Sequence, residues 1–350
     1  MVYASDKRTY YFNLQNKKMT IRIHKIYIFR VVLTILVFNL FLVIVVLGLK
    51  LFELNRGKVK GAQYITKINK NDISFSNQKN GLKYFYEPKP NNIEDWTRDW
   101  LDYEVKNTIN SDSLNERYDY SVVKDKNTFR IITLGDSFTF GQYADTKDNY
   151  SEILEDLLNK NKPCKEIKRF EVINLGVYGY DIEYEVERFK KRGVKYDPDL
   201  LIWLISQGNF QKINEKALPL EKQLIEQGVT GFDQNTKRYT PLVEAIDRSS
   251  KDLGKQFIFD YQAERFYLMK SIYQNKLLIL NHNHIHENVR ELIKIFISLN
   301  LNYSFFENLF PYLDDNGFKL ADNHPNRKGH KKMADDLYSY LIKNVLTSYK

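Results

Sequence analysis

Short apolar runs recur along the second half of the chain and predict its β-strands. They are rich in β-branched and aromatic residues and end in polar residues or glycine, as buried strands do. The five runs cover residues 129–134, 171–175, 200–205, 276–280 and 303–307. The third is Leu-Leu-Ile-Trp-Leu-Ile, apolar throughout, which is typical of a strand covered on both faces of its sheet.

Longer stretches with apolar residues at helical spacing lie between and after these strands. They cover residues 150–158, 182–191, 218–227, 242–253, 257–273 and 333–345. Most connections are short, but residues 210–275 are too long for a simple crossover. We interpret this stretch as a cap that leaves from the end of the third strand and lies over the candidate site described next.

The first strand ends in Gly135-Asp136-Ser137. Polar residues that follow a buried parallel strand lie at the carboxyl edge of the sheet, where open α/β sheets bind their ligands. Gly135 permits a tight turn there, which a residue with a Cβ atom would resist. Ser137 is therefore a candidate nucleophile, and such a serine needs a base to take its proton.

A candidate base lies near the C-terminus, in Ala321-Asp322-Asn323-His324-Pro325-Asn326 before the last helix pattern. An aspartate close to a histidine can orient the imidazole and stabilise its charged form. Asp322 and His324 are therefore predicted to act with Ser137. The alternative is a serine that caps a helix and a histidine in a surface turn.

With these blocks the chain resembles the SGNH (GDSL) hydrolase family over residues 120–349. The first family block is Gly-Asp-Ser-Phe at 135–138, and the last places Asp322 and His324 just before a final helix. The resemblance implies an α/β fold, a three-layer αβα sandwich with a mainly parallel five-stranded sheet. It also implies ester hydrolysis or acyl transfer by Ser137, without a cofactor or a metal.

The resemblance further implies an oxyanion hole that includes Ser137 and a glycine N–H after the second strand. Gly179 is the better match to that glycine, and Gly176 is the alternative nearer the strand. The family's third block, Gly-x-Asn-Asp, is altered here, because Asn209 comes one residue later than expected. Asn209 is the expected amide donor, with Gln207 as its alternative; loss of one such donor costs ~10²–10³-fold in rate.

The charge of the chain is concentrated at its N-terminus. Of the formal net charge of +9, residues 1–30 carry +6, from seven basic residues against Asp6, and the remaining 46 basic and 43 acidic residues carry +3. A basic excess confined to a tail argues against nucleic-acid binding as the function of the whole chain. A single cysteine, Cys164, excludes an intramolecular disulfide framework.

Residues 31–49 carry no charge and are almost entirely apolar. At ~1.5 Å per residue such a helix approaches the ~30 Å hydrocarbon core of a bilayer. We predict a transmembrane anchor at 31–51, a basic cytoplasmic tail at 1–30 and export of the rest. The alternatives are a cleaved signal peptide, although no Ala-x-Ala follows, and a buried helix of a soluble protein.

Residues 52–120 are predicted to form a stalk and a lead-in to the main domain at 121–350. In the lead-in, Trp96 and Trp100 stand at helical spacing. They are interpreted as an amphipathic turn that packs onto the main domain, with an aromatic platform for a sugar as the alternative.

A cluster of three histidines and the single residue His330 are further candidates for the site. His282, His284 and His286 follow the fourth strand, and His-x-His is a known zinc-ligand spacing. The alternative is a polar loop that leads to the next helix, from about Glu287. We favour contacts to a substrate over a metal site, since no cysteine lies nearby and this loop also lies at the catalytic edge of the sheet. His330 is expected to be structural.

These patterns predict a membrane-anchored enzyme that cleaves or transfers acyl groups outside the cytoplasmic membrane. Acetyl esters of cell-surface glycans are the preferred substrates, and lipids are the alternative. A non-catalytic carbohydrate-binding module that retains the fold is the second class of function.

Overall fold

The structure is a computed structural model that describes residues 33–34, 73–75, 81–281, 303–306 and 310–349. The chain divides into two compact units, Met1–Val59 and Lys60–Lys350. In the first unit only residues 33–34 are described, and they are helical. The predicted anchor at 31–51 therefore lies almost wholly outside the described residues. In the parts of the chain that are described, no helix is both long and apolar enough to cross a membrane.

The second unit is built on a parallel sheet whose strands follow the order β11-β10-β7-β5-β6. The strands are β5 (Thr128–Leu134), β6 (Arg169–Asn174), β7 (Leu200–Ile205), β10 (Lys276–Asn281) and β11 (Tyr303–Phe306). Every neighbouring pair runs in parallel. The α/β fold with a parallel sheet is confirmed, and each strand lies within one or two residues of its predicted position.

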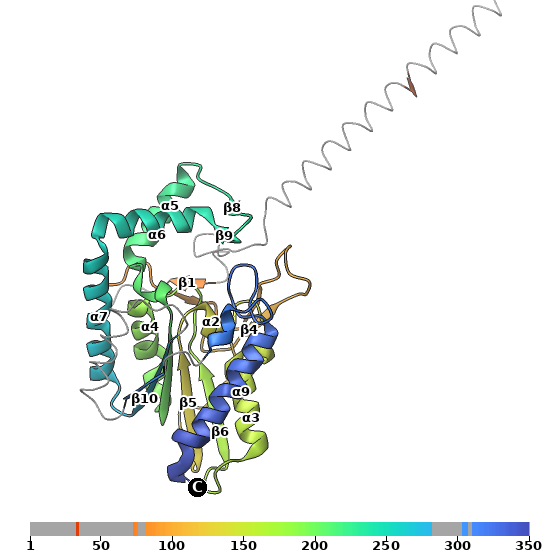
Figure 1. The fold of residues 1–350 in the computed structure, drawn as a ribbon, viewed down its shortest axis with the longest axis vertical. Helices are drawn as coiled ribbons and strands as arrows, with labels where there is room; N and C mark the ends of the chain where they lie inside the picture. Colours follow the sequence, from red (N-terminus) through yellow and green to blue (C-terminus); the bar gives the residue numbers. More distant parts are fainter. Residues whose placement is uncertain (1–32, 35–72, 76–80, 282–302, 307–309, 350) are drawn as a thin grey trace, which may run out of the picture. The chain divides into compact units, whose positions relative to one another are not determined.

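Alternate residues of β7 face opposite layers of helices, as the period of two requires. On β7, Leu201 and Trp203 belong to one hydrophobic cluster, and Leu200 and Ile202 to the other. Helices α4 and α7 cover the first face, and α3 and α9 cover the second (Figure 1). The second unit therefore has three layers, helix, sheet and helix, and the central strands are apolar on both sides for that reason.

The described helices of these two layers agree with the predicted stretches. They are α3 (Tyr150–Asn161), α4 (Ile182–Arg188), α7 (Lys255–Ile272) and α9 (Arg327–Asn344). Short helical turns lie between the main elements: α2 (Ser137–Phe140), η1 (Thr146–Asp148), η2 (Phe189–Gly193), η3 (Val194–Tyr196), η4 (Gln207–Phe210) and η5 (Pro311–Asp314). A further turn, η6 (Leu346–Tyr349), follows α9.

The insertion at 210–275 forms helices where the sequence predicts them, but only part of it is an addition to the sandwich. Helix α7 is the crossover helix of the sheet, because Phe266 stacks on Trp203 of β7 at 4.8 Å between ring centroids. The added part is the helix pair α5 (Asn214–Glu226) and α6 (Thr240–Leu253), joined by the hairpin of β8 (Phe232–Asp233) and β9 (Arg238–Tyr239). Figure 1 shows this pair above the sheet, on the side of the strand ends at which α2 lies.

The lead-in folds onto the domain through two small hairpins. They pair β1 (Ile73–Phe75) with β2 (Tyr86–Pro88) and β3 (Asn92–Asp95) with β4 (Lys106–Ile109). Trp96 is buried and packs against Tyr178 at 4.6 Å and Phe140 at 6.1 Å between ring centroids. The packing interpretation of Trp96 thus holds, although a strand followed by a turn takes the place of the expected helical turn.

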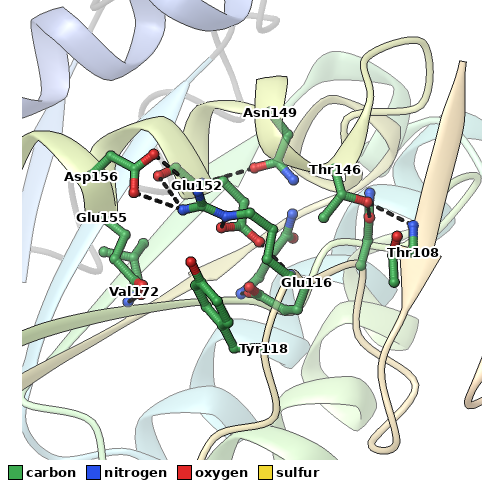
Figure 2. A network of polar contacts seen from close by, with 12 residues as sticks. Thr108, Glu116, Tyr118, Thr146, Asn149, Glu152, Glu155, Asp156 and Val172 are labelled. Atoms are coloured by element: carbon green, nitrogen blue, oxygen red, sulfur yellow. Dashed lines mark hydrogen bonds and ion pairs between the residues drawn. The ribbon is translucent and has the colours of Figure 1, made fainter.

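A network of polar contacts around the buried carboxylates Glu116, Glu152 and Glu155 ties the end of the lead-in to α3 (Figure 2). Arg117 belongs to the lead-in, and its side chain donates to Glu152 and to Asp156 of α3. Glu116 is fully buried and accepts a hydrogen bond from the backbone N–H of Asn174. Burial and the nearby Glu152 raise the pKa of Glu116 well above its ordinary value. Burial likewise raises the pKa of Glu155 to about 7.

Candidate active site

Ser137 lies at the start of α2, directly after the carboxyl end of β5. The turn is held by Asp136, whose side chain caps the helix by accepting from the backbone N–H of Phe138 at 3.0 Å. A Cβ atom on Gly135 would stand 2.3 Å from the Oγ1 atom of Thr139. Glycine is therefore needed here for the close approach of α2 to the strand.

The structure brings His324 and Asp322 to Ser137, as predicted. The Nε2 atom of His324 lies 2.7 Å from the Oγ atom of Ser137, and its Nδ1 atom lies 2.8 Å from the Oδ2 atom of Asp322. The backbone N–H of His324 also donates to Oδ1 of Asp322 at 3.2 Å. Ser137 and His324 are each 8% exposed and Asp322 is 3% exposed, so all three residues are buried.

The Asp322 carboxylate is suited to stabilise a charged imidazole. Burial by itself raises the pKa of this group, but the charge of His324 and its hydrogen bonds outweigh burial and hold the pKa of Asp322 below its ordinary value. The group is therefore ionised near neutral pH. An ionised acceptor at Nδ1 keeps the proton on that nitrogen and leaves Nε2 free to take the proton of Ser137.

Two aromatic rings fix the plane of the imidazole. Phe138 lies 5.3 Å from the ring of His324, and Tyr143 meets it edge-on at 5.1 Å with an interplanar angle of 87°. Tyr143 is fully buried, and its hydroxyl helps to hold the pKa of Asp322 below its ordinary value. The sequence gives no signal for Tyr143, because it stands in the turn after α2, where nothing in the spacing relates it to a histidine far along the chain.

The structure distinguishes the two glycines considered for the oxyanion hole. The N–H of Gly176 donates to Oδ1 of Asn174 at 2.9 Å, and a Cβ atom on Gly176 would stand 2.3 Å from the backbone nitrogen of Phe140. Gly176 is thus used for packing against α2. Gly179 has a φ of +73°, which favours glycine, and its N–H has no hydrogen-bond partner among the described residues.

Asn209 lies near the site, but its side chain is occupied. Its Nδ2 atom donates to Oε1 of Glu185 at 2.7 Å and to the carbonyl of Tyr180 at 3.3 Å. Its Oδ1 atom accepts from the backbone N–H and the hydroxyl of Ser206. An amide has two N–H hydrogens, and both have partners here. The expected donation from Asn209 to a substrate therefore requires one of these bonds to break.

The remaining histidines are not brought into the site. His282, His284 and His286 lie outside the described residues. His330 is fully buried and stacks on Tyr150, and burial lowers its pKa to about 3, so it is neutral and structural as expected. Among the residues that the structure describes, no group of three or more His, Cys, Asp or Glu side chains is arranged to hold a metal ion.

No family model matches the sequence, and no curated protein matches it either. Three esterase structures resemble the fold: the psychrotrophic esterase EstA from Pseudoalteromonas sp., a family 3 carbohydrate esterase from Clostridium thermocellum and a two-domain esterase, CEX, active on acetylated mannans. Their identities are 12%, 16% and 17%, and their TM-scores are 0.36, 0.37 and 0.40. The matches cover 63%, 64% and 63% of this chain, and 98%, 100% and 50% of those chains. At these identities and TM-scores the similarity says nothing about the chemistry of this chain, and the argument about chemistry rests on the geometry of the site.

Proposed function

We propose that the protein is a serine-dependent ester hydrolase of the SGNH type. The observation that carries this proposal is the continuous contact from Ser137 Oγ through the imidazole of His324 to the carboxylate of Asp322, at 2.7 and 2.8 Å. A serine hydroxyl is a weak nucleophile until a base in hydrogen-bond contact takes its proton, and this arrangement supplies the base together with the group that orients it.

The reaction follows from these contacts. The Oγ atom of Ser137 attacks the ester carbonyl while its proton passes to Nε2 of His324. The tetrahedral intermediate then expels the alcohol, which takes that proton and leaves an acyl group on Ser137. Water attacks the acyl-enzyme with His324 again as base, and the acid is released while the proton returns to Ser137. An acceptor alcohol in place of water would give acyl transfer by the same steps.

The negative charge of the intermediate requires donors that are in place before the reaction. We assign this role to the backbone N–H groups of Ser137 and Gly179. The positive φ of Gly179 and the absence of a partner for its N–H in the described part of the chain support this choice. Asn209 then supports the neighbouring loop through its bonds to Tyr180 and Glu185 and does not itself contact the substrate.

The proposed setting is outside the cytoplasmic membrane, with residues 31–51 as a single anchor and the N-terminus in the cytoplasm. The uncharged run at 31–49 and the basic flank before it support this proposal. In that setting the available esters are the O-acetyl groups of cell-surface glycans, which we prefer as substrates, and those of lipids, which are the alternative. We therefore propose acylated glycans as the substrate class.

An ester panel tests the proposed function. The full-length protein in detergent would be incubated with short-chain and long-chain p-nitrophenyl esters and with O-acetylated glycans, and the release of p-nitrophenol and acetate would be measured. We expect acetate release by the wild type and none by Ser137→Ala. A clear preference for long-chain esters would favour the lipase-like alternative. Glycan binding without hydrolysis by either protein would establish a binding module instead.

A further inference from the structure

Strand β2 of the lead-in and the loop that carries Gly179 are joined by reciprocal hydrogen bonds. The hydroxyl of Tyr86 donates to the carbonyl of Tyr178 at 2.5 Å, and the hydroxyl of Tyr180 donates to the carbonyl of Tyr86. All three tyrosines are buried, with no more than 1% of any side chain exposed. The loop after β6 is therefore held by a segment that lies outside the αβα sandwich.

The first of these bonds determines where the N–H of Gly179 points. The carbonyl of Tyr178 and the N–H of Gly179 belong to one planar peptide unit and are directed oppositely across it. A donor that fixes the carbonyl oxygen of Tyr178 thus fixes the direction of the Gly179 N–H. That N–H has no partner of its own in the described part of the chain.

The next peptide unit is held from the other side. The carbonyl of Gly179 accepts from Nζ of Lys212 at 2.6 Å and from Nδ2 of Asn214 at 2.9 Å. Both residues belong to the insertion, in the turn that enters α5 and at its first residue. The two peptide planes that meet at Gly179 are therefore anchored separately, one by the lead-in and one by the insertion. A glycine hinge that would otherwise sample many conformations is kept in one.

Tyr86 is well suited to act as a permanent donor. Its ring lies 5.2 Å from that of Tyr180 and 6.0 Å from that of Tyr184, both edge-on. Burial, with Tyr180 nearby, raises the pKa of Tyr86 well above its ordinary value, so the hydroxyl keeps its proton over any working pH. Because the ring is packed on several sides, removal of the hydroxyl leaves the packing in place.

We propose that Tyr86 is a positioning residue for catalysis: by holding the carbonyl of Tyr178 it aims the N–H of Gly179 at the oxygen that becomes negatively charged. This inference rests on the proposed function. Its consequence is that the lead-in belongs to the catalytic unit and is more than a spacer to the membrane.

Tyr86→Phe tests the role, with Tyr184→Phe as the matched control. The hydroxyl of Tyr184 donates to Oε1 of Glu215 at 2.5 Å in the same aromatic cluster, and none of its described contacts is with the peptide units of Gly179. Both substitutions remove one phenolic hydroxyl that donates a hydrogen bond, buried in the case of Tyr86 and part-buried in the case of Tyr184. Thermal unfolding of both variants would establish that they are folded at the assay temperature.

The readout is kcat and KM for p-nitrophenyl acetate, together with the rate at which a fluorophosphonate labels Ser137. We expect Tyr86→Phe to lower kcat and the labelling rate about 10-fold with KM little changed. Complete removal of one oxyanion-hole donor lowers the rate ~10²–10³-fold, and a Gly179 N–H that is only turned away from the oxygen should lose part of that effect. Tyr184→Phe should keep both rates within about twofold. Equal losses in the two variants, or an unchanged kcat in a folded Tyr86→Phe, would overturn the role. A wild type that neither labels nor hydrolyses any ester would refute the proposed function, and this inference with it.

Discussion

The Nε2 atom of His324 lies 2.7 Å from the Oγ atom of Ser137, although 187 residues separate them along the chain. Each partner is held locally. Asp136 caps the turn that presents Ser137, and Asp322 binds both the imidazole and the backbone N–H of His324. The loop of His324 is further closed by a hydrogen bond from the N–H of Leu320 to the carbonyl of His324 at 2.8 Å. Contacts within each loop thus hold the pair in hydrogen-bond contact, as an active site that is organised in advance requires.

Asp322→Asn should impair the base without removing it. The carboxylate accepts from the imidazole with one oxygen and from the backbone N–H of His324 with the other. An amide can replace only one acceptor, so either the tautomer or the orientation of His324 is lost in part. We expect kcat to fall by about 10²-fold, less than in His324→Ala. Steady-state kinetics of the two variants would measure this, and an Asn variant as impaired as His324→Ala would contradict it.

Asn209→Ala separates a structural role from an oxyanion role. The side chain is fully buried and bonded to Ser206, Tyr180 and Glu185. Its removal leaves buried partners unsatisfied, and we expect a loss of about 1–3 kcal/mol in the free energy of unfolding. Measured well below the unfolding transition, kcat should fall less than 10-fold. A fall of ~10²-fold or more, with stability and KM unchanged, would show that Asn209 is the amide donor after all.

Glu116→Gln should change how stability depends on pH. Where a carboxyl has a raised pKa in the folded protein, the folded state binds more protons than the unfolded state above pH 4.5, so the free energy of unfolding falls as pH rises. Glu155, with a pKa of about 7, and Glu116, with a pKa raised well above its ordinary value, both act in this direction. Glutamine resembles the protonated acid and cannot ionise, so the decline between about pH 5 and about pH 8 should be smaller.

Urea unfolding at the two pH values would measure this effect of Glu116. The groups that face it are Glu152, Glu155 and Tyr120, with Arg117 bound to Glu152. Glu166→Gln, at an exposed position, serves as the control and should leave the slope as in the wild type. A Glu116→Gln variant with an unchanged or steeper decline would show that the cluster does not hold its extra protons in the folded state.

The proposed anchor predicts the topology of the chain. The basic flank precedes the uncharged run, so the N-terminus should stay in the cytoplasm and the rest should be exported. A reporter enzyme that works only outside the cytoplasm should be active when it is fused after Lys350, and a cytoplasm-specific reporter should be inactive there. Activity of a cytoplasm-specific reporter would reverse the orientation, and recovery of a soluble protein that begins near Lys50 would replace the anchor by a cleaved signal.

The sequence predicts the strands and the reacting pair for physical reasons that act locally. The strands of a parallel sheet are buried on both faces, so runs such as Leu200–Ile205 stand out as continuously apolar. Ser137 and His324 stand out because each is a polar group at the boundary of a predicted strand or helix, where ligands bind in this fold class. The short spacing between Asp322 and His324 then makes their contact predictable from the chain itself.

The features that the sequence does not predict depend on contacts between segments that are distant along the chain. The orientation of the Asn209 side chain is set by its hydrogen bond to Glu185 on α4, and α7 packs onto the sheet through the contact of Phe266 with Trp203. The spacing of residues along the chain identifies neither Glu185 nor Trp203 as the contacting residue. Tyr86 is one of 25 tyrosines in the chain, and its bond to Tyr178 spans 92 residues. Such contacts are decided by how whole layers pack, so only a three-dimensional structure reveals them.

The most direct test of the account is whether Ser137 is an activated nucleophile. The full-length wild type would be treated with a fluorophosphonate, digested and analysed by mass spectrometry, beside Ser137→Ala and His324→Ala. The account predicts one phosphonyl group per chain on the peptide that contains Ser137, none in Ser137→Ala, and labelling slower by at least about 10²-fold in His324→Ala. A folded wild type that remains unlabelled, or one that labels equally fast without His324, would contradict it.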